Sequence, residues 1–517
     1  MKATLVATTL CSLLSTTLFS ASLPVEQTSS SWYTDAQTSL EAKINQIKKS
    51  SKAKNVILFV GDGMGVSTVT ASRILDGQNK GSNGEENALS FGDFPYSGLV
   101  KTYNTNSQTP DSAGTMTAMA SGVKTKIGVL GLSEETARAN CLSSKGTEVI
   151  SMMELAEKEG KSTGIISTAR LTHATPAATY AHSPERNWEN NSKLTQEAID
   201  NKCEDIASQF LSFSYGDGID VAMGGGRREF IPTTTTDVEG KNGKRTDGRD
   251  LREEWKSANP TGAYVETLAE FNAVDIADSS KLFGLFNYSH MQYEADRGND
   301  VAGEPSLTAM TQKAIEVLKK NDEGFVLMVE SGRIDHAHHA GNAYNALSDT
   351  IELSKAVAMA DAMTSDEDTL IIVTADHSHV FTIAGYPKRG NPILGKVQGI
   401  DGSGAGKTSD ALAADSLPYT TLGYTNGRGF MDLGSETDAD AGYGEAVHLS
   451  GRVDLSLVDT NTAGFHQEAT VPLNSETHAG EDIGVYAKGP GAHYAQGVME
   501  QNVVFHMINT AADLGAK

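Results

Sequence analysis

The chain has 517 residues, a net charge of −24 at pH 7 and a hydrophobic fraction of 38%. This acidic balance argues against nucleic acid or an anionic membrane as a partner, because both require a basic face. No Pro/Ser-rich linker or internal repeat divides the sequence, so we predict one large domain with insertions. An acidic protein that acts on an anionic substrate must supply positive charge locally, and bound metal ions would supply it.

Residues 1–21 have the pattern of a secretory signal peptide. Lys2 precedes a moderately apolar stretch that ends in small residues suited to cleavage. The stretch is too short and too polar to span a membrane. We therefore expect residues 22–517 to form an exported protein, periplasmic or secreted, without a membrane anchor. Two cysteines remain after cleavage, Cys141 and Cys203, and in an oxidising compartment they could form one disulfide.

Short apolar runs alternate with helical patterns along the chain. Segment 305–320 has helical spacing, with Pro305 expected in its first turn. This alternation predicts an α/β fold, a three-layer sandwich with a large, mostly parallel central sheet flanked by helices. The predicted strands are Lys54–Val60, Gly164–Ser167, Ile219–Met223, Leu282–Phe286, Phe325–Val329 and Thr369–Thr374.

Two regions break this alternation. Residues 227–275 are charged and rich in turn formers, which is typical of a surface insertion. Residues 385–475 are rich in Gly, Asp and Thr and are long enough to form an inserted lobe. A disordered loop is the alternative for the second region, but its scattered Tyr, Phe and Leu residues favour an ordered lobe.

Carboxylates and imidazoles gather behind two of the predicted strands. The stretches VESGRIDHAHH (329–339) and TADHSH (374–379) contain five of the 13 histidines. In the first, Glu330 lies at a strand end, and the i, i+4 spacing of Asp335 and His339 places both on one face of a helical turn. Asp376-His377 likewise follows the other strand. The C-terminal ends of strands are where open α/β sheets build their sites.

Each of these residues, considered alone, could be a helix cap or an ordinary loop residue. Two carboxylate/histidine pairs at the ends of consecutive strands are harder to explain in that way, because buried carboxylates repel one another and need a cation. We therefore predict a metal centre. Mixed carboxylate and imidazole ligands favour zinc, and a harder ion suits a position where oxygen ligands dominate.

Further candidates lie nearer the N-terminus. Asp62 stands in the glycine-rich turn GDGMG, whose spacing fits neither a dinucleotide-binding motif nor a P-loop, and glycine would let the backbone approach a metal closely. Ser112 follows Pro110-Asp111 near a predicted helix start. It could be a plain helix cap or a nucleophile activated by a metal. Arg186 offers the two-pronged donor that suits phosphate, although a single arginine is usually a solvated surface residue.

Several segments together resemble the alkaline phosphatase family, from about residue 53 to 515. The resemblance is weakest in 231–275 and 385–475. His173 and His336 stand where the enterobacterial type has Asp and Lys, so the resemblance is closer to the animal type. The matching segments are GDGMGVSTVTASRIL (61–75), PDSAGT (110–115), TYAHSPERNW (179–188), VAMGGGRREF (221–230), VESGRIDHAHH and TADHSH.

The resemblance implies a role for each candidate residue. Ser112 would be the nucleophile and Arg186 would bind the phosphate. His173 and His336 would act in the outer shell through water, and the spacing of Cys141 and Cys203 is similar to that of a disulfide in the animal enzymes. One zinc ion would be held by Asp335, His339 and His478, a second by Asp62, Asp376 and His377, and magnesium by Asp62, Thr175 and Glu330.

The activity that the resemblance implies is hydrolysis of phosphate monoesters through a phosphoserine intermediate, with two Zn²⁺ and one Mg²⁺ per subunit and a high pH optimum. Asn287 stands where the animal enzymes have a glutamate that helps to bind calcium, which makes a structural Ca²⁺ ion doubtful. The 385–475 lobe corresponds to the crown region of those enzymes and would help to form a homodimer.

Two other functions compete with this one. A phosphodiesterase or a sulfatase of the same metal superfamily would need a threonine or a cysteine-derived nucleophile, whereas residue 112 is serine. A non-enzymatic, acidic cation-binding surface protein would explain the charge but leaves Ser112 and Arg186 without a role.

Overall fold

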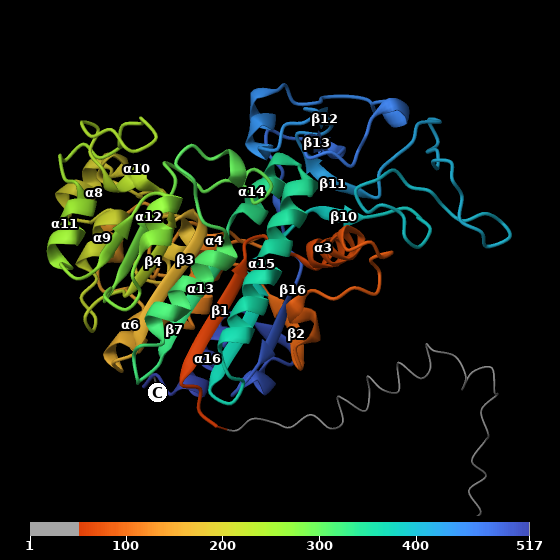
Figure 1. Cartoon of the computed structure of the whole chain (residues 1–517). Coiled ribbons are helices and arrows are strands. Elements are labelled where there is room, and N and C mark those ends of the chain that lie inside the picture. The colour runs from red at the N-terminus through yellow and green to blue at the C-terminus, as the bar shows by residue number, and fades with distance from the viewer. Residues whose placement is uncertain (1–50, 516–517) are drawn as a thin grey trace, which may run out of the picture. The chain divides into compact units, whose positions relative to one another are not determined.

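The computed structural model describes residues 51–515, so the predicted signal peptide lies outside the described part of the chain. A ten-stranded sheet runs through the described residues. Its centre is β1 (Asn55–Gly61), which pairs in parallel with β7 (Phe325–Ser331; Figure 1) on one side and with β8 (Thr369–Ala375) on the other. All three strands are apolar and almost completely buried, as the continuous apolar runs predict.

The sheet is mostly parallel, which confirms the predicted fold class. Only β16 runs against its neighbours, pairing antiparallel with both β2 and β8. The strand order is β17 (Gly497–Glu500), β2 (Tyr96–Lys101), β16 (Ile483–Lys488), β8, β1, β7, β3 (Ser162–Arg170), β4 (Val221–Gly225), β6 (Leu282–Leu285) and β5 (Ala263–Val265).

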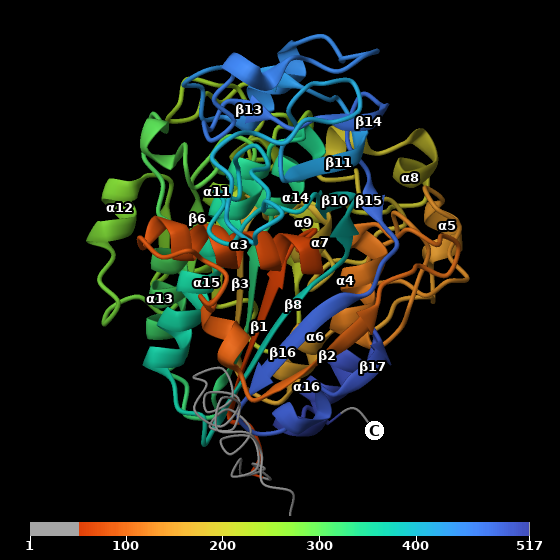
Figure 2. The ribbon, with the colours of Figure 1, turned by 90° about the vertical axis from the view of Figure 1, so that its right-hand side faces the viewer.

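Helices cover both faces of the sheet (Figure 2). One face carries α3 (Val66–Asn79), α13 (Leu307–Leu318) and α15 (Ala343–Met363), and the other carries α4 (Ser112–Ser121), α6 (Met152–Lys158) and α16 (Val503–Ala512). Shorter helices lie around the sheet: α5 (Cys141–Ser144), α7 (Ala174–Ala177), α8 (Gln196–Asp200), α9 (Ile206–Ser212), α10 (Arg227–Phe230), α11 (Leu251–Ala258), α12 (Leu268–Ala273) and α14 (Arg333–Ala340).

The helix predicted over 305–320 begins later than expected. It starts at Leu307, and Ser306 is its N-cap, with the Ser306 hydroxyl accepting from the Ala309 N–H over 3.2 Å. Pro305 therefore precedes the helix instead of lying in its first turn. The capping hydroxyl, which satisfies a free N–H of the first turn, fixes this boundary.

The two atypical regions differ in how they join the fold. Part of 227–275 returns to the main sheet, because β5 pairs in parallel with β6 at the sheet edge. The 385–475 region forms a lobe on the side where β1 and β7 end (Figure 1). The strands within the lobe are β11 (Leu422–Gly427), β12 (Met431–Asp432), β13 (Phe465–His466) and β14 (Ala469–Pro472). The short strands β9 (Ser378–His379), β10 (Phe381–Ile383) and β15 (His478–Ala479) flank it in the sequence.

Cys141 and Cys203 are joined by a disulfide, with Cα atoms 6.0 Å apart. Cys141 is buried in a small cluster with Trp188 and Ala198. Within residues 51–515, no helix has both the length and the apolar character needed to cross a membrane.

Candidate active site and metal centre

The strand register brings the predicted metal ligands to one edge of the sheet. Val60 of β1 is level with Glu330 of β7 and with Thr374 of β8. Asp62 and Asp376 each follow the end of their strand, so both emerge at the same edge as Glu330. Parallel pairing thus gathers residues that are more than 300 positions apart in the sequence.

Asp335, His339 and His478 form the first candidate ligand cluster. The His339 Nε2 lies 3.1 Å from the His478 Nε2 and 3.3 Å from the Asp335 Oδ1. The His478 Nε2 lies 3.4 Å from the same Asp335 oxygen. Three ligands of a tetrahedral zinc ion with bonds of about 2.0 Å are separated by about 3.3 Å. The three side chains therefore converge as zinc ligands do.

The protonation of this cluster also fits a cation. The Nδ1 atoms of His339 and His478 contact the main-chain oxygens of Glu476 and Pro110 at 2.6 and 2.8 Å, so each Nδ1 carries the proton and donates. Both Nε2 lone pairs then point at each other and at the Asp335 carboxylate. Such an arrangement is repulsive without a positive ion between the three groups.

The second candidate cluster consists of Asp62, Asp376 and His377. The His377 Nε2 lies 3.4 Å from the Asp62 Oδ1 and 3.4 Å from the Asp376 Oδ2. Asp376 uses its other oxygen to accept from the Gly63 N–H at 3.0 Å. All three side chains are fully buried, and the His377 ring stacks on the His478 ring with centroids 3.6 Å apart. The first two clusters are therefore neighbours.

The third candidate cluster consists of Asp62, Thr175 and Glu330, all oxygen donors. Each contributes a buried oxygen without a hydrogen-bond partner, and Asp376 Oδ2 is a fourth such atom. Burial raises the pKa of Asp62 well above its usual value, an effect that the charges of Asp376 and Asp335 increase, and burial raises the pKa of Glu330 to about 7. Unsatisfied buried carboxylates carry a large desolvation cost, which coordinated cations would remove.

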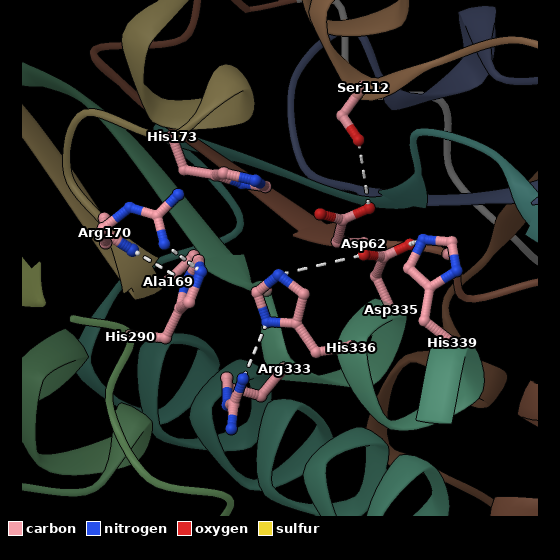
Figure 3. Close-up of polar contacts among 12 residues, drawn as sticks. Asp62, Ser112, Ala169, Arg170, His173, His290, Arg333, Asp335, His336 and His339 are labelled. Atoms are coloured by element: carbon pink, nitrogen blue, oxygen red, sulfur yellow. Dashed lines mark hydrogen bonds and ion pairs between the residues drawn. The ribbon is translucent and has the colours of Figure 1, made fainter. Parts of the chain in front are cut away.

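Ser112 stands between these clusters as the first residue of α4. Its hydroxyl lies 3.2 Å from the His377 Nε2 and 3.5 Å from the Asp62 Oδ1 (Figure 3 shows the Asp62 contact). Asp111 is the N-cap of this helix and accepts from the Gly114 N–H. The capping role that Ser112 could have taken therefore belongs to its neighbour, which leaves the Ser112 oxygen free to face the candidate ligands.

Arg186 approaches Ser112 from the segment after α7. Its Nη1 donates to the Asp111 Oδ2 over 2.9 Å, and its Nη2 lies 3.3 Å from the His173 Nε2. Burial opposes the charged form of Arg186, but the charge of Asp111 and its hydrogen bond outweigh burial and raise the arginine pKa. The guanidinium is therefore a permanent positive charge held on Asp111, the residue before the serine.

His173 and His336 lie beside the candidate ligands, as Figure 3 shows. A third histidine, His290, joins them and was not predicted from the sequence. Its ring centroid lies 4.1 Å from that of His336 and 5.3 Å from that of His173, and Arg170 contacts it from behind. Nothing in the local sequence around His290 distinguishes it from a surface histidine.

Sequence reasoning also gave no role to His379, although it belongs to the TADHSH stretch. The His379 Nε2 lies 2.8 Å from the Asp335 Oδ1, and its Nδ1 lies 2.5 Å from the Glu476 Oε2. Burial disfavours its protonation, yet the two carboxylates outweigh burial and raise the His379 pKa to about 10. His379 therefore orients the Asp335 carboxylate. Its i, i+2 spacing from His377 on an extended segment was the available signal.

Asn287 lies in an acidic environment formed by Asp300 and Glu304. Its amide donates to the Asp300 Oδ1 at 3.2 Å and to the Glu304 Oε2 at 3.4 Å. Burial raises the pKa of Glu304 to about 8. An amide that already donates to both carboxylates fits a cation poorly at this position.

The fold and these clusters are those of a metal-dependent α/β hydrolase, and comparison with known proteins makes the class specific. Residues 53–514 match the family model described as alkaline phosphatase. The chain is 44% identical to the tissue-nonspecific isozyme of alkaline phosphatase from Gallus gallus over 94% of its length and 89% of the relative's. The Homo sapiens isozyme is also 44% identical, over 94% of this chain and 88% of its own. The chain belongs to the alkaline phosphatase family.

Solved structures agree with this assignment. Alkaline phosphatase from Thermus thermophilus superposes with a TM-score of 0.62 at 25% identity, covering 96% of this chain and 97% of its own. The enzyme from the Antarctic bacterium TAB5 shares the fold, with a TM-score of 0.58 at 23% identity over 90% of this chain and all of its own. The protein is thus a phosphoric monoester hydrolase (EC 3.1.3.1) of a family that requires divalent metal ions, and the resemblance to the animal type is confirmed.

Proposed function

We propose that the protein hydrolyses phosphate monoesters through a phosphoserine intermediate on Ser112, at a site that holds two zinc ions and one magnesium ion. The observation that carries this proposal is the position of the Ser112 oxygen, 3.2 Å from His377 and 3.5 Å from Asp62, beside buried carboxylate oxygens that lack partners. A hydroxyl in that position adjoins two of the three residues that we propose as ligands of the second zinc ion.

The donor sets support the choice of metals. The cluster of Asp335, His339 and His478 and the cluster of Asp62, Asp376 and His377 mix imidazole with carboxylate, which zinc prefers. The cluster of Asp62, Thr175 and Glu330 offers only oxygens, which suits magnesium. Zinc, when bound, lowers the pKa of a hydroxyl that it coordinates and neutralises charge that develops on the phosphate.

The residues of the chain then account for the two chemical steps. The Ser112 oxygen forms a bond to phosphorus while the bond from phosphorus to the leaving alcohol oxygen breaks. Water next attacks the phosphoserine, which releases inorganic phosphate and restores Ser112. The N-terminus of α4 favours negative charge at this point. Arg186 donates two parallel hydrogen bonds to the phosphoryl oxygens.

His173 and His336 support the site from its outer shell, through water. Burial is the main reason that the pKa of each ring is lowered, to about 3 for His336, so both rings stay neutral at the alkaline pH where the family works.

We also propose that the chain is exported, to the periplasm or beyond the cell, and forms a homodimer with the 385–475 lobe at its interface. For Asn287 and its neighbours we propose no calcium ion, because the amide donates to the carboxylates that would bind it.

The decisive experiment measures p-nitrophenyl phosphate hydrolysis by the purified protein from pH ~6 to ~11, before and after chelation, with zinc and magnesium returned singly and together. Alkaline activity that is lost on chelation and needs both metals for full recovery is the expected result. Faster hydrolysis of bis-p-nitrophenyl phosphate or of a sulfate ester would place the protein in a sister group. Recovery with magnesium alone would contradict the zinc assignment.

A further inference from the structure

The inserted lobe reaches the candidate active site through one carboxylate. Asp440 of the lobe accepts from the Arg333 Nη2 over 2.8 Å. Arg333 is the first residue of α14, the helix that also carries Asp335 and His339, and its side chain is only 4% exposed. A residue 107 positions away thus pairs with a buried cation beside the predicted metal ligands.

Asp440 fixes the orientation of the guanidinium. Its second oxygen accepts from the hydroxyl of Tyr293 at 2.8 Å, and the Arg333 guanidinium lies 3.7 Å from the centroid of the Tyr293 ring. Tyr293 is completely buried, so neighbouring side chains restrain its ring. The Asp440 main chain is held as well, because its N–H donates to the Asp438 side chain at 2.9 Å. Ring and carboxylate together leave Arg333 one orientation.

The other side of the guanidinium meets His336. The Arg333 Nη1 lies 3.0 Å from the His336 Nδ1. A guanidinium has no acceptor, so Arg333 must donate and the His336 Nδ1 must carry the lone pair. The proton of the neutral ring is therefore on Nε2, which lies 4.0 Å from the Asp335 Oδ2 (Figure 3 draws this contact as a dashed line). Asp440 holds Arg333, and Arg333 donates to the His336 Nδ1. The His336 Nε2 is therefore the nitrogen that carries an N–H toward the candidate active site.

We propose that Asp440 is a positioning residue, through which the inserted lobe sets the orientation and the tautomer of His336 at the catalytic site. This inference rests on the proposed outer-shell role of His336. Loss of the Asp440 charge would leave a buried guanidinium without its counter-ion, and Arg333 would turn away from His336. The ring could then adopt the other tautomer and present a lone pair, instead of an N–H, toward Asp335 and the phosphate.

The test compares Asp440→Asn with Asp454→Asn in the metal-loaded full chain. Asp454 is a control from the same lobe, where it caps a 3-10 turn by accepting from the Ser456 N–H. For Asp440→Asn we expect kcat to fall about 3- to 10-fold, with KM and zinc content little changed. Tyr293→Phe, which keeps the ring and removes one hydrogen bond to Asp440, should lower kcat less. Wild-type kcat in Asp440→Asn, or an equal loss in Asp454→Asn, would overturn the proposal.

A double-variant cycle separates this inference from the function on which it rests. If Asp440 acts through His336, the Asp440→Asn change has no further effect on kcat in a His336→Gln background. Additive losses in kcat would overturn the positioning role and leave the outer-shell role of His336 intact. Wild-type activity of His336→Gln alone would instead overturn the outer-shell role, and the inference with it.

Discussion

Arg186 and Asp111 form an ion pair in which the arginine Nη1 donates to the aspartate Oδ2 over 2.9 Å. Asp111 also caps the helix that begins with Ser112, and it accepts from the Gly128 N–H at 2.9 Å. One carboxylate therefore fixes both the proposed nucleophile and the proposed phosphate-binding arginine. Their relative position is determined before any substrate arrives, which is the preorganisation that charge stabilisation requires.

Replacing Arg186 by lysine tests the arginine. Lysine keeps the charge and loses the paired N–H donors, so we expect KM for phosphate esters and the inhibition constant of inorganic phosphate each to rise about 10-fold. Steady-state kinetics at saturating zinc and magnesium measures both. Arg138→Lys is the control, because Arg138 forms a similar pair with Glu185 in the same region and should leave KM unchanged. If the KM and the phosphate inhibition constant of Arg186→Lys equal those of the wild type, the arginine does not bind phosphate.

Replacing Ser112 by alanine tests the nucleophile. We expect kcat to fall at least about 1,000-fold while zinc and magnesium contents stay intact, since no candidate ligand is lost. Rapid acid quenching with radiolabelled substrate should trap a phosphoprotein in the wild type only. Ser121→Ala is a suitable control on the same helix, where the Ser121 hydroxyl donates to the Thr117 main-chain oxygen. Normal turnover by Ser112→Ala would refute the assignment.

The buried Glu157 predicts a stability change with pH. Burial raises its pKa to about 8, although the Thr163 hydroxyl donates to it at 2.5 Å. The folded state thus binds a proton more tightly than the unfolded state, so this group destabilises the fold as the pH rises from about 5 to about 8. Glu157→Gln keeps the acceptor for Thr163 and removes the charge. Its Tm should match the wild type near pH 5 and exceed it by several degrees near pH 9.

Calorimetry at both pH values, with metals saturating, measures this difference in Tm. Glu159→Gln is the control, because Glu159 is an exposed residue of the same segment. The difference in Tm between Glu159→Gln and the wild type should not increase with pH. A constant difference between Glu157→Gln and the wild type at both pH values would contradict the prediction.

The disulfide predicts a further stability effect. Cys141 and Cys203 are separated by 62 positions, and closing a loop of that size stabilises a fold by about 4 kcal/mol in the chain-entropy description. The double variant Cys141→Ser/Cys203→Ser should lose a comparable free energy of unfolding in urea. Dithiothreitol should lower the stability of the wild type to that of the variant and leave the variant itself unchanged. Insensitivity of the wild type to reduction would show that the bond contributes nothing.

The sequence predicts the parallel strands β1, β3, β4, β6, β7 and β8 and misses the antiparallel strand β16 and its neighbour β2. Strands such as β1 and β8 are buried on both faces and give continuous apolar runs. In β16 buried residues alternate with partly exposed ones, β2 has only Val100 buried, and each strand contains a glycine, so neither forms such a run. Helix α13 shows the same limit at its first residue. The Ser306 cap makes the helix begin at Leu307, so Pro305 lies outside it.

Site residues could be predicted when their own strand or helix places them. Glu330, Asp335 and Asp376 follow apolar runs, so their position at the sheet edge follows from topology. The roles of His379 and His290 depend on partners far away in the chain, since His379 is 97 positions from Glu476 and His290 is 120 from Arg170. No local pattern encodes such contacts, and only the folded chain reveals them.

The pairing of β15 with β9 places His478 next to His379, and His478 lies in the last tenth of the 517-residue sequence. Synthesis proceeds from the N-terminus, so Asp335 and His339 emerge long before the imidazole that completes their cluster. A nascent or prematurely terminated chain would therefore lack one of the three residues that we propose as ligands of the first zinc ion. On the proposed ligand assignment, tight zinc binding would therefore come late in maturation, and chains that end before His478 would lack activity.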